Sequence, residues 1–209
     1  MTGEPSITQG YRHLCEAAEK GGFFDRMASI YGEMDRAYDE VAGRYGFSCT
    51  GCVDNCCLTR FYHHTAIEYA YLLRDFMDLP RDRRSETMER ALAYSREMKR
   101  VLAVNGSFSR MCPLNENGLC LLYASRPMIC RLHGIPHELA PPGRPKTYGA
   151  GCGAFEVQCG KGVYHPFDRT PFYAAMADLE RRFKEAAGIS RKVKMTVAEM
   201  LSSVSEHTP

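Results

Sequence analysis

Four cysteines lie in one short run of this chain, Cys49-Thr-Gly-Cys52-Val-Asp-Asn-Cys56-Cys57. The two residues between Cys49 and Cys52 allow the backbone to turn so that both sulfurs point at one centre, as they do in thiolate metal sites. A disulfide between the neighbours Cys56 and Cys57 would be strained. The run therefore predicts thiolates that bind a metal rather than a disulfide framework.

The adjacent pair Cys56-Cys57 leads to a further prediction. Side chains of neighbouring residues diverge, so two adjacent cysteines seldom ligate the same small ion. We expect either that the two sulfurs face different centres, or that one ligates while the other packs or reacts. The first alternative would place two metal centres around this run.

Five more cysteines in the second half of the chain extend the candidate ligand set. They are Cys112, Cys120 and Cys130, followed by Cys152 and Cys159 among glycines. The candidate ligands then number nine, and two four-ligand centres would use eight of them. The remaining cysteine, Cys15, stands alone on a predicted helix, where a free thiol usually packs as a small hydrophobe.

The uneven spacing of these cysteines favours iron–sulfur over zinc. Structural zinc sites usually draw on two regular pairs of ligands, whereas a larger cluster tolerates ligands from distant segments. We therefore expect one or two iron–sulfur clusters, most simply of the 4Fe–4S type, with zinc as the alternative. Arg126 and Arg131 flank Cys130 and are candidate cofactor-binding residues, because four thiolates on either metal leave a net negative charge. The alternative is that Arg126 and Pro127 only form a turn.

Histidines near the cysteines are weaker candidates. His63, His64, His133 and His137 could each ligate a metal or carry a proton, but a surface or capping histidine is the more ordinary interpretation. The cysteine spacing is not that of radical-SAM enzymes, and no Walker loop is present. No convincing helix follows the glycine-rich residues 149–153, which we interpret as turns around Cys152.

The elements that position these residues are predicted to be mainly α-helical. Apolar residues recur at helical spacing, with capping boxes at Thr65–Glu68 and Thr196–Glu199 and a start signal at Ser85. The predicted helices cover residues 9–20, 23–41, 65–79, 85–104, 170–188 and 196–204. Between them, residues 107–168 are irregular and rich in glycine and proline, and we expect metal coordination to organise this segment.

Length and composition suggest one domain, residues 1–209, with the helices of residues 169–205 closing it. The formal net charge of +2 provides no strong attraction for nucleic acid. No stretch is apolar for the ~20 residues that span a bilayer, and the N-terminus lacks a signal-peptide core. We expect a cytoplasmic protein that does not bind membranes.

The pattern Cys-x2-Cys-x3-Cys-Cys, followed by Cys-Pro-x6-Cys-x2-Tyr-x2-Arg-Pro-x2-Cys-Arg, resembles the cysteine-cluster family described as a zinc- or iron-chelating domain. The match runs over residues 49–131 and includes Gly118 and Tyr123. The resemblance implies that the family's cysteines are Cys49, Cys52, Cys56, Cys57, Cys112, Cys120 and Cys130. A related cysteine cluster occurs in flagellin lysine N-methylase, so modification of a protein lysine is a conceivable activity.

Three functions agree with these observations. The first is an iron–sulfur protein in electron transfer, redox sensing or a modification reaction, which would need a protein or redox partner. The second is a zinc-stabilised interaction module without catalysis. The third is a metal-dependent protein-modifying enzyme, which would need an open coordination position. The sequence leaves the substrate, the oligomeric state and whether the protein is an enzyme undetermined.

Overall fold

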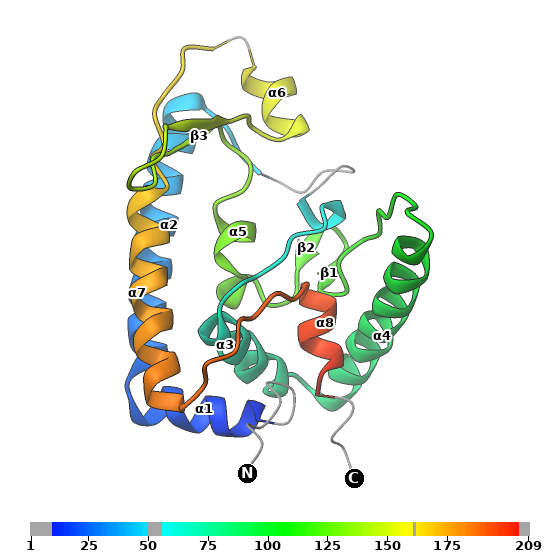
Figure 1. Ribbon diagram of the computed structural model, residues 1–209. Helices are drawn as coiled ribbons and strands as arrows, with labels where there is room; N and C mark the ends of the chain where they lie inside the picture. The colour runs from blue at the N-terminus through cyan, green and yellow to red at the C-terminus, as the bar shows by residue number, and fades with distance from the viewer. Residues whose placement is uncertain (1–9, 50–55, 161, 205–209) are drawn as a thin grey trace.

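The structure is a computed structural model that describes residues 10–49, 56–160 and 162–204. It is mainly α-helical, as predicted (Figure 1), and each predicted helix is present. These helices are α1 (Tyr11–Lys20), α2 (Phe23–Tyr45), α3 (Ala66–Met77), α4 (Arg81–Ala103), α7 (Thr170–Ala187) and α8 (Val197–Ser202). The predicted start of α4 at Ser85 is wrong. The helix begins four residues earlier, directly after Pro80, whose fixed φ favours a helix start.

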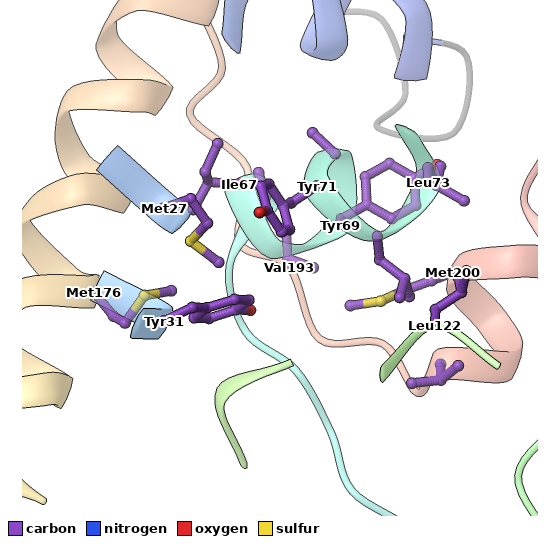
Figure 2. Close-up of a cluster of buried hydrophobic side chains, with 14 of the residues drawn as sticks. Met27, Tyr31, Ile67, Tyr69, Tyr71, Leu73, Leu122, Met176, Val193 and Met200 are labelled. Atoms are coloured by element: carbon purple, nitrogen blue, oxygen red, sulfur yellow. The ribbon is translucent and has the colours of Figure 1, made fainter. Parts of the chain in front are cut away.

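Helix α3 is the centre of the core. It contacts α1, α2, α7 and α8, and most of its residues are buried, including Tyr69, Leu72 and Phe76. Figure 2 shows Ile67, Tyr69, Tyr71 and Leu73 of α3 among side chains from α2, α7 and α8. Burying one such side chain contributes about 1.5–3 kcal/mol. An apolar surface on nearly every side of α3 is therefore what holds the other helices together.

The helices leave a space in which the cysteine-bearing segments lie. In Figure 1, α2 and α7 run side by side, and α4 lies with α8 across the molecule. Helix α5 (Met128–Arg131) and the hairpin of β1 (Asn115–Glu116) and β2 (Leu119–Cys120) lie between these two pairs. The short 3-10 turn η2 (Cys56–Leu58) precedes α3.

The segment 107–168 contains more regular structure than predicted. Besides α5 and the first hairpin it holds η3 (Tyr123–Ser125), a second hairpin of β3 (His137–Leu139) and β4 (Thr147–Gly149), and α6 (Gly153–Cys159). The expectation that no helix follows the glycines around Cys152 is wrong. Phe155 of α6 is buried against Tyr45 and Phe47, and this packing stabilises a helix too short for a clear periodic signal.

Buried apolar residues organise this segment. Leu132 and Ile135 follow α5 and are fully buried in the core, and Phe167 is buried ahead of α7. Hydrophobic packing therefore fixes much of the path of residues 107–168. The added contribution of a metal remains a prediction. Among the described residues, no helix has the length and apolar character needed to cross a membrane.

His63 makes the stability of the fold depend on pH. Its backbone pairs with Met195, and its side chain is only 3% exposed. Burial, with a smaller effect of the neighbouring His64, lowers the pKa of His63 from 6.5 to about 4. The unfolded chain therefore binds a proton at His63 more readily than the folded protein does. The stability that the buried, neutral His63 contributes is intact above its pKa in the unfolded chain, and it is lost as the pH falls towards its pKa in the folded protein.

We predict that the free energy of unfolding of the wild-type protein, relative to His63→Gln, falls by about 2 kcal/mol between about pH 7.5 and about pH 5. The glutamine variant lacks the titrating group, so it shows every other pH effect but not this one. Denaturant titrations of both proteins at the two pH values measure the difference. A difference that does not change with pH would contradict the prediction.

Candidate metal centre

Six cysteines from sequence-distant segments line one cavity of about 150 Å³. They come from the first cysteine run and from the group beyond residue 107, which the fold brings together. They are Cys49, Cys56, Cys57, Cys112, Cys120 and Cys130. Residues of α2, α4 and α8 complete the wall, among them Tyr38, Tyr94 and Val197. The predicted meeting of the two cysteine groups is therefore present in the fold.

Backbone hydrogen bonds bring three of these cysteines together. The amide of Cys112 donates to the carbonyl of Cys57 at 2.8 Å. The chain then reverses through Asn117-Gly118, both with positive φ, which is the requirement of a tight hairpin turn. This turn pairs Asn115 with Cys120 and returns Cys120 to the side of Cys112. An Asn-Gly pair is a strong sequence signal for such a hairpin, so this turn could have been found from residues 117 and 118 alone.

Cys130 reaches the cavity from the opposite side, on the single turn of α5. Helix α5 packs against α2, and the fully buried Leu132 anchors the residues that follow it. Arg131, on the same turn, also lines the cavity. The position of Cys130 therefore depends on how this one turn is held.

Burial keeps most of these thiols protonated in the absence of a metal. Desolvation raises the pKa of Cys112 to about 12 and that of Cys120 to about 11. Desolvation, followed by the charges of Cys112, Cys120 and Cys57, raises the pKa of Cys130 well above its usual range. These four thiols all line the cavity, where each thiolate would oppose the ionisation of its neighbours. A cation among them would favour their deprotonation.

The prediction that the sulfurs of Cys56 and Cys57 face different centres is wrong, whereas the alternative that only one of them ligates stays a prediction. Both residues line the same cavity, and their thiols share a hydrogen bond. Both residues belong to the 3-10 turn η2, and side chains diverge less in a helical turn than in an extended strand. The hydrogen bond raises the pKa of Cys56 and lowers that of Cys57, so Cys57 is the more acidic thiol of the pair.

Arg126 and Arg131 both line the cavity, as expected for charge-compensating residues. Arg131 is almost fully buried, with its guanidinium 4.1 Å from the Tyr31 ring centroid. Asp35 of α2 forms ion pairs with both arginines, at 3.2 Å with Arg126. Two cations thus share one partly exposed carboxylate, which leaves positive charge at the thiols. Asp35 could not be predicted from the sequence, because nothing in the pattern of α2 distinguishes it from a solvated acid.

The remaining predicted ligands lie off this cavity or outside the described residues. Cys52 belongs to residues 50–55, which are not described. The Cys152 amide donates to the carbonyl of Gly134, and the Cys159 thiol donates to the carbonyl of Tyr45 at 3.4 Å beside a separate surface pocket. Cys15 packs against the core, as expected of a thiol alone on a helix.

Two of the candidate histidines line the cavity. His63 is buried rather than at the surface, and His133 packs edge-on against Phe61 at 5.3 Å between ring centroids. Burial, followed by the charge of Arg169, lowers the pKa of His133. Both imidazoles are therefore neutral near pH 7, the form in which a histidine binds metal or accepts a proton.

In residues 10–49, 56–160 and 162–204, no group of three or more Cys, His, Asp or Glu side chains is arranged so that it could hold a metal ion. Comparisons with protein-family models, curated proteins and solved structures find no match. The resemblance to the cysteine-cluster family therefore remains an expectation from the motif.

We predict that Cys57 reacts with iodoacetamide faster than Cys112 and Cys120 in metal-free protein near pH 7. Its pKa is lowered while burial raises that of Cys112 and Cys120, and the thiolate is the nucleophile. Mass-spectrometric mapping of alkylation over time measures this order. Cys56→Ala should slow the reaction at Cys57 and Cys56→Ser should not, because serine retains a hydrogen-bond donor. Faster alkylation of Cys112 than of Cys57 would contradict the assignment.

Proposed function

We propose that this protein binds an iron–sulfur cluster, most simply 4Fe–4S, through Cys57, Cys112, Cys120 and Cys130, and that it functions in electron transfer. These four thiols are the ones that influence one another's ionisation most consistently. When bound, such a cluster supplies one-electron redox chemistry. The chain contributes the thiolates, the surrounding charge and the exclusion of water.

The observation that carries the proposal is the cavity lined by six cysteines. In a four-thiolate zinc site the Zn–S distance is about 2.3 Å, so the sulfurs close around the ion and leave almost no internal space. A cavity of about 150 Å³ equals several water molecules in volume. A cluster of irons and sulfides requires such a space between its thiolates, which supports iron–sulfur over zinc.

One buried donor supports an anionic group at this site. Arg131 Nε is buried without a hydrogen-bond partner in the described part of the chain. A second donor, the Asn115 side chain, already bonds to the Cys57 sulfur and lowers the pKa of that thiol. A buried donor without an acceptor costs about 1–3 kcal/mol. Negatively charged sulfur would satisfy donors of this kind, since cluster sulfurs commonly accept hydrogen bonds.

The cavity approaches the surface beside Cys120, which favours electron transfer over a purely structural role. Leu119 and Tyr123 both line the cavity, yet they are 62% and 60% exposed. Arg126 lies over the Tyr123 ring, 3.6 Å from its centroid. A partner that covers these side chains would come close to the thiols, which is the geometry that a redox partner requires.

Metal and acid-labile sulfide analysis of anaerobically purified protein tests the proposal. We expect a brown protein with about four irons and about four sulfides per chain, the composition of a single 4Fe–4S cluster. Visible absorption that bleaches on reduction should accompany this composition. Stoichiometric zinc without sulfide would reject it and favour the zinc-stabilised interaction module.

We predict that alanine substitution of Cys57, Cys112, Cys120 or Cys130 removes most of the bound iron. Each substitution deletes one of the four proposed ligands, and a three-thiolate site holds its cluster less tightly. Cys15→Ala and Cys159→Ala are matched controls, because these thiols donate to the carbonyls of Ala70 and Tyr45 away from the cavity. Iron content per folded chain is the measurement. Equal iron loss in the controls would contradict the assignment of ligands.

A further inference from the structure

Two helices of this protein begin with the same type of capping sequence but use it differently. In α8, Thr196 and Glu199 form a complete capping box, in which the Glu199 carboxylate accepts from the Thr196 amide at 2.8 Å. In α3, the Thr65 hydroxyl accepts from the Glu68 amide in the same way. The Glu68 carboxylate, however, accepts from the amide of Met128, far along the chain, at 2.7 Å. The carboxylate of Glu68 therefore forms a tertiary contact with α5.

Glu68 is fully engaged and buried. It is 3% exposed, and it also accepts from the Thr65 hydroxyl at 2.6 Å and from the Tyr31 hydroxyl at 3.3 Å. Its contacts therefore join α2, α3 and α5 at one carboxylate. The Tyr31 hydroxyl that donates to Glu68 belongs to a ring that lies under the Arg131 guanidinium, so Glu68 is connected to α5 by two routes.

Helix α5 needs such an external contact. It has four residues, and its N-cap residue, Pro127, provides no side-chain cap. One helical turn is unstable on its own, and its first amides have no partner inside the helix. The Met128 amide is one of these, and Glu68 satisfies it. Cys130 and Arg131 follow Met128 on the same turn, and both line the thiol cavity.

We propose that Glu68 is a positioning residue for the metal centre: its carboxylate holds the single turn of α5 so that Cys130 and Arg131 face the other thiols. This inference rests on the proposed function. Burial raises the pKa of Glu68 itself, and its hydrogen bonds with Thr65, Met128 and Tyr31 oppose that rise. Its effect on the centre is therefore assigned to geometry, through the bond to the Met128 amide.

Glu180 of α7 provides a matched control. It is likewise a largely buried carboxylate that accepts backbone amides, those of Ala66 at 2.9 Å and Ile67 at 3.1 Å. Burial raises the pKa of Glu180, its bonds with the Ala66 and Ile67 amides lower it, and the charge of Glu68 adds to the rise. Removing Glu180 disturbs the same helix, α3, without touching α5. A general loss of stability should therefore affect a Glu68 variant and a Glu180 variant alike.

The experiment compares Glu68→Ala, Glu68→Gln and Glu180→Ala in full-length protein loaded with its metal. We expect Glu68→Ala to release metal to a chelator about 10- to 100-fold faster than wild type, the usual effect of losing a group that orients a ligand. Glu68→Gln keeps an acceptor for the Met128 amide, so it should release metal at nearly the wild-type rate. Glu180→Ala should release metal at the wild-type rate per folded chain.

Equal acceleration in Glu68→Ala and Glu180→Ala, or none in Glu68→Ala, would overturn the positioning role. The identity of the metal bound by the wild-type protein tests the proposed function separately. The role of Glu68 is tested by the release rate, whether the released metal is zinc or iron. If the wild-type protein binds no metal, the alkylation rate of Cys130 decides whether Glu68 positions this residue. Glu68→Ala should then expose Cys130 to iodoacetamide, whereas Glu68→Gln and Glu180→Ala should leave it as protected as in wild type.

Discussion

Gathering thiols in a space shielded from water is the constraint on which the rest of this structure depends. Desolvation opposes the charged form of each thiol, and each neighbouring thiolate would oppose it further. The positive charges of Arg126 and Arg131 at the cavity wall offset part of this unfavourable free energy. Asp35 holds the two guanidinium groups in place from α2 while leaving part of their charge uncompensated. A metal cation would offset the rest.

The same constraint explains how the scaffold is built. The thiols come from a 3-10 turn, a short hairpin with the residues just before it, and one turn of helix, none of which is stable alone. Each is fixed from outside. The hairpin is held by the Cys112–Cys57 backbone bond and its Asn-Gly turn, and α5 by Glu68 and the buried Leu132. The stable element behind Glu68 is α3, whose apolar surface is buried on several sides.

The cavity is accordingly divided into two kinds of wall. The inner side is anchored to α2 and α3 through Tyr31, Asp35 and Glu68, which are held by hydrogen bonds and ion pairs. The outer side is formed by the hairpin and η3, with Leu119 and Tyr123 exposed. A redox centre benefits from both, since a rigid, charged inner wall sets its electrostatics and a thin outer wall lets a partner approach.

The sequence by itself determined the helices and predicted the chemical type of the site. Helical periodicity and capping signals are local, so α1, α2, α3, α7 and α8 could be predicted from the residues within each. The clustering of cysteines is also local, and it indicated metal chemistry before any fold was known. Sequence spacing does not encode which thiols share a space. The expectation for Cys56 and Cys57 failed because it assumed diverging side chains, whereas both belong to a helical turn facing one cavity.

Only the tertiary structure decided the membership and the support of the site. It placed Cys112, Cys120 and Cys130 with Cys57, and left Cys152 and Cys159 away from the cavity. It also turned Glu68 from a helix cap, as the sequence predicted, into the anchor of α5. The physical reason is that a buried carboxylate accepts a hydrogen bond from whichever amide the packing places beside it. That choice is made by the core around α3, not by the residues next to Glu68 in the chain.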